Sequence, residues 1–201
     1  MNKRSTTIIA EAGVNHNGSI DIAKKMIDAA AKAGADFVKF QTFKAEMLVT
    51  RTADKAEYQK NLNDKNESQF AMLKKLELDR ATHNELIRHC EEKRIQFLSS
   101  AFDHDSIDLL AELNIPLYKI PSGEITNLPY LRHIGNMGKP VIMSTGMATL
   151  EEVQVAMDVL LKAGIKKNGL TILHCNTEYP TPMKDVNLKA MLTIRDELGV
   201  A

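Results

Sequence analysis

Short apolar runs rich in β-branched residues recur along the chain and alternate with segments whose apolar residues return every three or four positions. The first pattern predicts buried strands and the second predicts amphipathic helices. The predicted strands cover residues 7–10, 37–40, 95–98, 117–120, 141–143 and 170–173. Because strands and helices alternate, the pattern predicts a parallel sheet with helices packed against it.

The number of strand and helix pairs separates a closed barrel from an open sheet. A (β/α)₈ barrel takes about 250 residues, or roughly 31 per βα unit, so that six units need about 190. The chain has 201 residues. The count predicts a TIM-type (β/α)₈ barrel truncated after about six βα units, with residues 1–201 as one incomplete domain. A doubly wound open sheet is the alternative.

Residues that start and stop helices agree with this alternation. Thr149 precedes two glutamates as a helix N-cap, and Gly34, Gly138 and Gly164 follow helical segments as stop signals. The longest departure is the polar stretch from Lys44 to Lys65, and long insertions between a strand and a helix usually carry function. No change in composition marks an internal domain boundary.

Composition and charge exclude several classes of partner. The 26 Lys and Arg balance the 26 Asp and Glu, so no global field favours nucleic acid or anionic lipid. Apolar residues make up 44% of the chain, but no window approaches the roughly 18 apolar residues of a membrane span. With two cysteines and no apolar signal core at the start, the sequence predicts a protein of the reducing cytoplasm.

Polar residues at the ends of the first two strands are candidates for chemistry, because parallel α/β folds place their active sites at the carboxyl ends of strands. Glu11 and His16 share one Asn- and Gly-rich loop, which as an ordinary turn would leave both solvated. Lys39 and Gln41 point to the same face of their strand. We expect Lys39 to be an inward-facing anion ligand; an edge-strand lysine reaching water is the alternative.

The fourth and fifth strands end in the strongest cluster. Lys119, Ser122 and Glu124 follow the fourth strand, and Ser144 ends the fifth, followed by Gly146, which lets a ligand approach the backbone. Lysines combined with hydroxyl and backbone donors suit a phosphate dianion. We expect Lys39 and Lys119 to reach one common cavity and neutralise one small phosphorylated acid.

Other polar residues carry weaker signals. Ser100 precedes Asp103, which we expect to cap a helix. His174 is more typical of a satisfied core histidine than of a ligand, and Cys175 is assigned no chemistry because no activating base is evident. The other histidines that we expect at the surface are His83, His89, His104 and His133. The nucleotide-binding motifs GxGxxG and GxxxxGK[ST], the zinc motif HExxH and the hydrolase motif GxSxG are all absent from the sequence.

Six strings together resemble the sialic acid synthase family, which includes the N-acetylneuraminate and legionaminate synthases. They are "IIAEAGVNHNGS", "GADFVKFQTF", "FLSSAFD", "YKIPSGEITNLPYL", "KPVIMSTGMATLEEV" and "LHCNTEYPTP". The resemblance runs through essentially the whole chain in order, and "KIPSGEITN" and "HCNTEYPTP" are its most specific parts.

The resemblance implies condensation of phosphoenolpyruvate with an N-acetylated mannosamine-type sugar and water, which gives a nine-carbon 2-keto sugar acid and phosphate. It implies that Glu11 and Glu124 are catalytic, Glu124 by handling the proton of the attacking water. It further implies that Gln41 and Tyr179 face the sugar. The phosphoenolpyruvate ligands that it implies are Lys39, Lys119, Ser122, Ser144, Ser100 and Phe102. Whether Asn176 or Thr177 meets the sugar stays open.

The resemblance also implies features that we expect beyond residue 201. Family members use Mn²⁺ or Mg²⁺, bound by histidines on later barrel strands, and they are homodimers with a small antifreeze-like C-terminal domain. We therefore expect this chain, assayed alone, to be inactive. Two alternatives remain: a Schiff-base aldolase with Lys39 or Lys119 as nucleophile, and a non-catalytic phosphosugar-binding protein of polysaccharide assembly.

Overall fold

The computed structural model describes residues 6–53 and 68–200, which fall into two compact units, Met1–Leu109 and Leu110–Ala201. The sequence predicts no boundary because the division falls inside a helix, α6 (His104–Glu112), and not in a linker rich in glycine or proline. Each unit holds one three-stranded parallel sheet. The (β/α)₈ barrel therefore stays a prediction, while the alternating α/β order with parallel sheets is confirmed.

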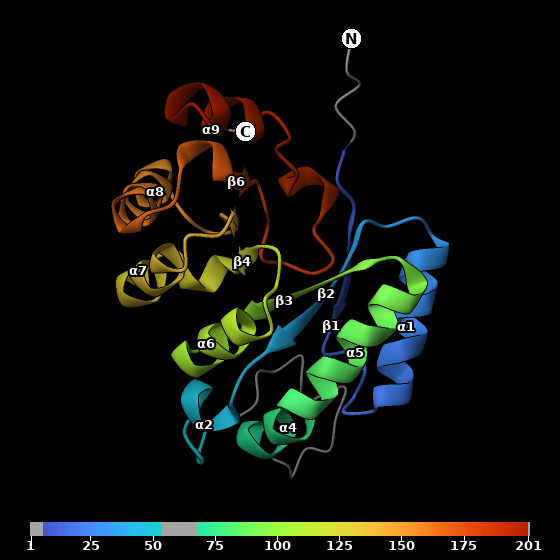
Figure 1. Ribbon diagram of the computed structural model, residues 1–201. Coiled ribbons are helices and arrows are strands. Elements are labelled where there is room, and N and C mark those ends of the chain that lie inside the picture. Colours follow the sequence, from blue (N-terminus) through green and yellow to red (C-terminus); the bar gives the residue numbers. More distant parts are fainter. Residues whose placement is uncertain (1–5, 54–67, 201) are drawn as a thin grey trace. The chain divides into compact units, whose positions relative to one another are not determined.

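The first unit is built on strands β1 (Ile9–Gly13), β2 (Phe37–Thr42) and β3 (Gln96–Ala101), in the order β1-β2-β3. Its helices are α1 (Ile20–Lys32), α2 (Ala45–Leu48), α4 (Gln69–Leu76) and α5 (Arg80–Lys93). Helices α1 and α5 lie side by side in Figure 1 and pack on each other. The sheet core is apolar on that side, where the Phe40 and Phe97 rings stack with centroids 5.6 Å apart.

The second unit repeats the arrangement with strands β4 (Tyr118–Ile120), β5 (Val141–Ser144) and β6 (Leu170–Leu173). Its α-helices are α7 (Leu128–Asn136), α8 (Leu150–Ala163) and α9 (Ala190–Leu198), and three short 3₁₀ turns cover η1 (Ser122–Glu124), η2 (Lys167–Gly169) and η3 (Met183–Asp185). Helices α7 and α8 lie side by side (Figure 1). With α6 after β3, the six predicted strand–helix units are all present.

Most strands are longer than the apolar runs that predict them. Strand β1 reaches Gly13, β2 reaches Thr42, β3 reaches Ala101 and β5 reaches Ser144, so residues expected to follow the strands lie within them. The prediction was short because polar side chains on one face of a strand break the apolar run. Several of those side chains contact a neighbouring strand, as Thr42 does with Ser99 and Ser144 does with Lys119.

The predicted helix ends are confirmed. The Thr149 side chain accepts from the Glu152 amide and the Glu152 carboxylate accepts from the Thr149 amide, which forms a capping box. Gly164 ends α8 with a φ of 126°, a backbone conformation that glycine adopts at little cost. Asp103 caps α6 as expected, because its carboxylate accepts from the Ser106 amide at 2.7 Å.

The long polar insertion is only partly visible. Residues 54–67 lie outside the described part, so the prediction for this stretch is tested only at its start. There, the Lys44 amide donates to Asp103 at 2.8 Å and the Ala45 amide donates to Glu77 at 2.7 Å. These bonds fix the start of α2 against the residues that flank β3 and α4.

Helices α7 and α8 approach closely through small residues. Gly135 of α7 faces the end of α8, and a Cβ atom placed on Gly135 would lie 2.3 Å from Ala163 Cβ and 3.3 Å from the Leu160 carbonyl oxygen. Real Cβ atoms do not come this close to other atoms. The helix pair therefore depends on the missing side chain at Gly135.

A buried network of hydroxyl and imidazole groups ties α5 to β2 and β3. The Asp79 carbonyl, 2.8 Å from His83 Nδ1, can only accept, so Nδ1 carries the proton and Nε2 accepts from Thr42 Oγ1 at 2.8 Å. Thr42 Oγ1 in turn accepts from Ser99 Oγ at 2.7 Å. His83 is fully buried, so the expectation that it lies at the surface was wrong. His83 is buried because it lies on the same face of α5 as Leu86 and Cys90, and this face packs against the sheet.

His16 is also buried and does not form part of an open polar loop. Its Nδ1 accepts from the Gly18 amide at 3.0 Å, so Nε2 carries the proton, and that atom is buried without a hydrogen-bond partner. The ring packs beside Phe40, with centroids 6.2 Å apart. His16 is fully buried, so the interpretation of it as a solvated turn residue is wrong, while a part in binding a ligand is untested.

We expect acid to destabilise the first unit through these two histidines. Burial lowers the pKa of His83, and burial together with the nearby His83 lowers the pKa of His16. The unfolded chain therefore takes up protons at a higher pH than the folded chain. The unfolding free energy should fall as pH drops below about 6.5, by up to about 1.4 kcal/mol per pH unit for each histidine.

Urea unfolding at several pH values between 7.5 and 5.5 measures this effect. His83→Gln should flatten the pH dependence, whereas His104→Gln, at an exposed position on α6, should leave it as in the wild type. A wild-type stability that does not change over this range would contradict the prediction.

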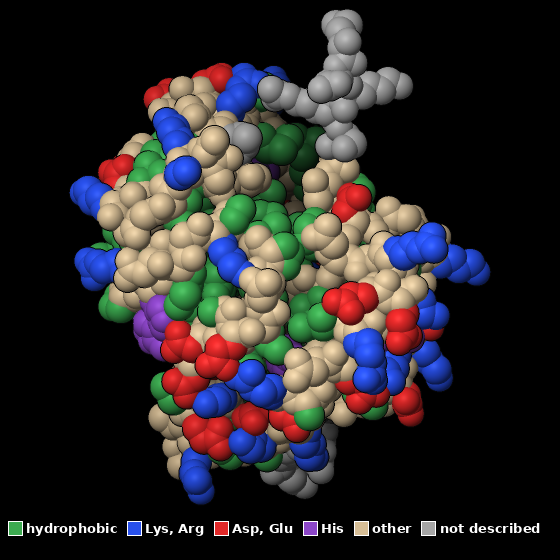
Figure 2. Space-filling model, viewed as in Figure 1, with side chains coloured by type: hydrophobic (Ala, Val, Ile, Leu, Met, Phe, Trp, Pro, Cys, Tyr) green, Lys and Arg blue, Asp and Glu red, His purple; other side chains and the backbone are tan. Residues whose placement is uncertain are grey.

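Charged side chains of both signs are intermingled on the visible face (Figure 2). This distribution fits the balanced composition. Among residues 6–53 and 68–200, no helix combines the length and the apolar character that a membrane crossing requires.

Candidate active site

The carboxyl ends of β1 and β2 place an acid and a base opposite each other. Glu11 and Lys39 are register partners in the parallel ladder, and their side chains form an ion pair. The Lys39 side chain is 12% exposed and that of Glu11 is 54% exposed. Lys39 is thus neither an edge lysine reaching water nor an isolated buried charge, because its anionic partner comes from the neighbouring strand.

Gln41 and Ser100 extend this face of the first sheet. They are register partners on β2 and β3, and they share the face of Lys39 because side chains alternate along a strand. A Cβ atom on Gly13 would lie 3.3 Å from Glu11 Oε1 and 3.8 Å from Gln41 Nε2, so glycine leaves room for both side chains. Ser100 is 2% exposed.

Phe102 follows β3 and packs edge-on against Phe43, with ring centroids 6.5 Å apart. The structure therefore gathers five of the residues that the sequence singles out at one end of the first sheet. They are Glu11, Lys39, Gln41, Ser100 and Phe102.

Lys119 is the centre of the corresponding end of the second unit. Its side chain reaches from β4 to the neighbouring strand β5, and the residue is 7% exposed. Its ammonium group donates to Ser144 Oγ at 2.7 Å and to the Ile120 carbonyl at 2.8 Å. Acceptors from β4 and β5 therefore hold the end of the Lys119 side chain in place.

Ser122 and Gly146 bring a second hydroxyl to the same unit. The Gly146 amide donates to Ser122 Oγ at 2.9 Å, which joins the loops that follow β4 and β5. A Cβ atom on Gly146 would lie 2.7 Å from Thr177 Cγ2 and 2.9 Å from Ser122 Oγ. The groups that approach Gly146 closely belong to the protein itself, so the approach of a ligand to this backbone stays a prediction.

Cys175 also contacts this cluster, which the sequence did not indicate. Its Sγ atom lies 3.3 Å from Ser144 Oγ. The contact depends on the pairing of β5 with β6, which no local pattern reveals. Lys119, Ser144 and Cys175 therefore form one hydrogen-bonded group contributed by β4, β5 and the segment after β6.

Glu124 is held by the residue that caps the next helix. Asn127 is the N-cap of α7: its Oδ1 accepts from the Tyr130 amide at 3.3 Å, and its Nδ2 donates to Glu124 Oε2 at 2.7 Å. Because the cap uses the amide oxygen, the NH₂ group must face the carboxylate. Asn127 was missed because it reads from sequence as an ordinary cap.

The two roles of Asn127 can be separated by substitution. Asn127→Ala should lower the unfolding free energy by about 1 kcal/mol, because the cap is lost. Asn127→Ser should recover most of that loss, since serine caps well but does not supply the amide donor to Glu124. Chemical denaturation of the three proteins measures this, and equal stability of the alanine and serine variants would contradict the assignment of the cap.

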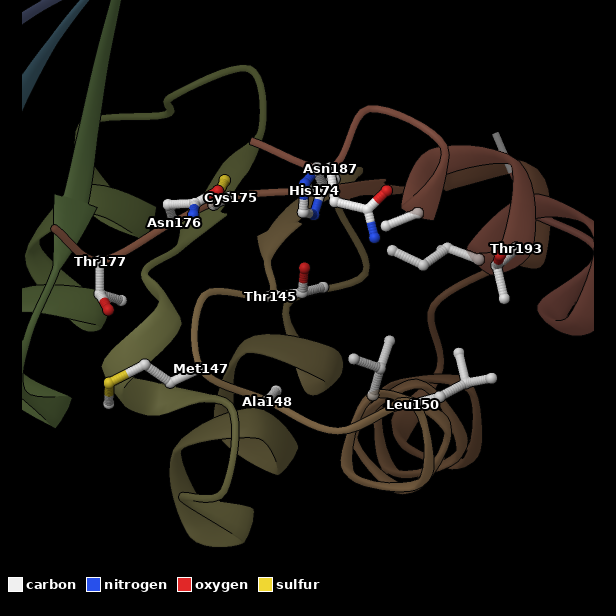
Figure 3. A pocket seen from close by; sticks show the side chains of 13 residues that line it. Thr145, Met147, Ala148, Leu150, His174, Cys175, Asn176, Thr177, Asn187 and Thr193 are labelled. Atoms are coloured by element: carbon white, nitrogen blue, oxygen red, sulfur yellow. The ribbon is translucent and has the colours of Figure 1, made fainter. Parts of the chain in front are cut away.

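The second unit also has a pocket of about 530 Å³, and Cys175 is one of the residues that line it. Its lining comes from the β5–α8 loop and the start of α8, from the segment after β6, and from the approach to α9 and α9 itself. Figure 3 shows the His174 imidazole next to Asn187, with Thr145 pointing into the same space. His174 Nε2 is buried without a hydrogen-bond partner, so His174 is not the satisfied core histidine that its context favours.

The segment after β6 carries the residues implied to meet the sugar. Asn176 and Thr177 both line the pocket, and Asn176 Nδ2 donates to the Asp185 carbonyl at 3.2 Å. Tyr179 is 85% exposed, so in this structure it is not packed into the group around Lys119. Which of these side chains contacts a sugar stays a prediction.

The described residues do not make a metal site by themselves. Within residues 6–53 and 68–200, no group of three or more His, Cys, Asp or Glu side chains could hold a metal ion. We therefore derive no step through a metal. The expectation of ligands beyond residue 201 is untested, as is the expectation that Lys39 and Lys119, which belong to different units, share a cavity.

Comparison with known proteins identifies relatives along nearly the whole chain. The NeuB family model matches residues 26–201. An N,N'-diacetyllegionaminic acid synthase of Campylobacter jejuni is 54% identical over 193 residues, which are 96% of this chain and 58% of that protein. A synthase of the same name from Legionella pneumophila is 50% identical and is matched over 94% of this chain and 54% of its own length.

A solved structure agrees with these matches. The N-acetylneuraminic acid synthetase of Leptospira borgpetersenii, crystallised with citrate, superimposes with a TM-score of 0.80 at 29% identity, over 96% of this chain and 62% of that one. The chain thus spans somewhat more than half the length of the relatives it matches. Since the family model covers most of its residues and the identities reach one half, the chain belongs to the NeuB family.

Proposed function

We propose that the whole protein condenses phosphoenolpyruvate with an N-acetylated amino sugar and water, giving a nine-carbon 2-keto sugar acid and phosphate. The relatives named as legionaminic acid synthases support this proposal. The observation that carries it is the buried Lys119 ammonium bonded to Ser144, because a cation and a hydroxyl fixed together suit a phosphorylated carboxylic acid.

In this proposal, phosphoenolpyruvate is bound by the residues that the family resemblance implies. Lys119, Ser122 and Ser144 supply a charge and two hydroxyl groups from the second unit. Lys39 supplies a second charge from the first unit, beside Ser100 and Phe102. To bind the ligand, the Lys39 ammonium group must exchange the Glu11 carboxylate for an anionic oxygen of phosphoenolpyruvate.

The remaining residues orient the sugar and move a proton. C3 of phosphoenolpyruvate forms the new bond to the aldehyde carbon while water adds at C2, after which the C2–O bond to phosphate breaks. Glu124, oriented by Asn127, takes the proton of the attacking water. Glu11, Gln41 and Tyr179 contact the sugar. When bound, a divalent Mn²⁺ or Mg²⁺ ion would polarise the aldehyde oxygen, and we propose that its ligands lie outside this chain.

The lysine contacts favour this proposal over a Schiff-base aldolase. A nucleophilic lysine must lose its proton. Lys39 is ion-paired with Glu11, and the two oxygen atoms that Lys119 contacts at 2.7 and 2.8 Å both accept hydrogen bonds. A nucleophilic role would require Lys39 to leave its ion pair and Lys119 to leave its two oxygen acceptors. Borohydride trapping with pyruvate should therefore give no covalent adduct.

Calorimetry with phosphoenolpyruvate, with and without Mn²⁺, tests the proposal. It is run on this chain and on a version extended by two βα units taken from the Campylobacter jejuni relative. We expect both proteins to bind phosphoenolpyruvate, and only the extended one to respond to Mn²⁺. Synthase activity of the unextended chain would contradict the expectation that it is inactive, and binding without turnover in the extended protein would favour the non-catalytic alternative.

Glu124→Gln tests the proton transfer in the extended protein. Phosphoenolpyruvate affinity should stay unchanged, while turnover should fall by roughly 100-fold or more, as for the loss of a general base. Near-normal turnover would remove Glu124 from the mechanism. We further propose that the whole protein is a cytoplasmic homodimer; both cysteines are free in the structure, which fits a reducing compartment.

A further inference from the structure

The Ser144 hydroxyl has a defined set of neighbours. An ammonium group can only donate, so Ser144 Oγ accepts from Lys119 Nζ at 2.7 Å. Cys175 Sγ lies 3.3 Å from the same oxygen. A hydroxyl oxygen has two acceptor positions and one proton. Once Lys119 occupies one acceptor position, the second acceptor position and the O–H donor of Ser144 are still available for other partners.

We propose that Cys175 is a positioning residue of the anion site. Its S–H group donates to the second acceptor position of Ser144 Oγ, which leaves the Ser144 proton free to point at a bound anion. The inference rests on the proposed function, because it concerns the site assigned to phosphoenolpyruvate. It adds a role for a residue to which the sequence assigned none.

The strengths of the competing hydrogen bonds explain why a thiol suits this position. Sulfur is a weak acceptor, so it competes poorly with an anion for the Ser144 proton. A hydrogen bond from a hydroxyl to a charged oxygen is roughly twice as strong as one between neutral groups. An anion therefore accepts the hydrogen bond of the Ser144 O–H group, while the S–H group of Cys175 donates to Ser144 Oγ. The bond to the anion polarises Ser144 Oγ and so strengthens the S–H···O bond.

The position of Cys175 in the chain fits this role. It lies two residues after the end of β6, and the Leu173 carbonyl accepts from the Thr145 amide at 3.2 Å, which holds the segment after β6 beside the residue that follows Ser144. In Figure 3, the neighbouring His174 lies beside Asn187, while Cys175 lies on the side of Asn176. The thiol is thus separated from the unpartnered imidazole of His174.

Cys90 is a natural reference, because the sequence has two cysteines. It belongs to α5 in the other unit and is 1% exposed, and burial raises the pKa of its thiol to about 12. An S–H group in such a place should keep one infrared stretching band whatever binds at Ser144. A change in the second S–H band then reports on Cys175.

The test measures phosphoenolpyruvate affinity by calorimetry on this chain and on its Cys175→Ala and Cys175→Ser variants. Loss of a neutral hydrogen bond should weaken binding by about 2- to 13-fold in Cys175→Ala. Cys175→Ser supplies an O–H donor and should stay within about twofold of the wild type. A role in packing alone would not be rescued by the more polar serine.

Infrared spectroscopy supplies the readout that a structural role would not move. Adding phosphoenolpyruvate should shift one S–H band to lower wavenumber, the Cys90 band should stay fixed, and the shift should be absent in Ser144→Ala. Wild-type affinity in Cys175→Ala, or a Cys175 band that does not respond, overturns the inference.

Two further variants separate this failure from failure of the proposed function. If Ser144→Ala and Lys119→Met weaken binding while Cys175→Ala does not, only the role of Cys175 is lost. If neither variant changes affinity, or if the wild-type chain binds neither phosphoenolpyruvate nor inorganic phosphate, the anion site itself is refuted and the inference with it.

Discussion

Lys119→Met should weaken phosphoenolpyruvate binding by roughly 10- to 150-fold, the range expected for one lost hydrogen bond from a charged donor. Methionine keeps the length and most of the volume of the lysine side chain, so the change removes the charge and its hydrogen bonds but little packing. The unfolding free energy should stay within about 2 kcal/mol of the wild type. The variant loses two hydrogen bonds, but it also avoids the desolvation cost of burying a charge. Calorimetry and urea unfolding on the same preparations measure both quantities.

Lys139→Met is the matched control for this variant. Lys139 belongs to the same unit, and its ammonium group donates to Asn114 Oδ1 and to the Ile115 carbonyl, each at 2.7 Å, near the start of β5. The control should lose some stability and keep its affinity. Equal affinities of the two methionine variants would show that Lys119 is not an anion ligand.

Gly135→Ala should destabilise the second unit by about 2 kcal/mol, although alanine is a better helix former than glycine by about 1 kcal/mol. The added methyl group would lie 2.3 Å from Ala163 Cβ, so α7 and α8 must move apart. Overpacking of this kind typically costs about 1–3 kcal/mol. Urea unfolding followed by circular dichroism measures the change.

Two variants show whether the cause is the contact between the helices. Gly123→Ala adds the same methyl group where no atom lies within 4 Å of the new Cβ, and it should have little effect. Ala163→Gly, combined with Gly135→Ala, removes the clash and should recover part of the lost stability. A Gly135→Ala protein as stable as the wild type would contradict this account of the helix pair.

The strands could be predicted because their central residues are apolar, but their ends could not. Ser99 is fully buried and Ser100 is 2% exposed, yet both look like loop residues in the sequence. Ser99 is satisfied by Thr42 of the neighbouring strand. A one-dimensional pattern contains no information about that partner, so buried polar residues end the predicted strand too early.

The candidate site could be predicted where its residues are close in sequence. Lys119, Ser122 and Glu124 form one short motif, and the structure keeps them near the end of a single strand. The pairing of Glu11 with Lys39 and the contact of Cys175 with Ser144 depend on which strands are neighbours. Those contacts need the register of the sheets, which the sequence pattern leaves undetermined.

The ion pair of Glu11 and Lys39 determines how selective a ligand site at Lys39 can be. A ligand that reaches this ammonium group does not fill an empty place but replaces a carboxylate already bound there. Common monovalent ions such as chloride offer no advantage over that internal competitor. At the anion site that we propose, this internal competitor should lower the affinity for every anion and favour molecules with several anionic oxygens over monovalent ions.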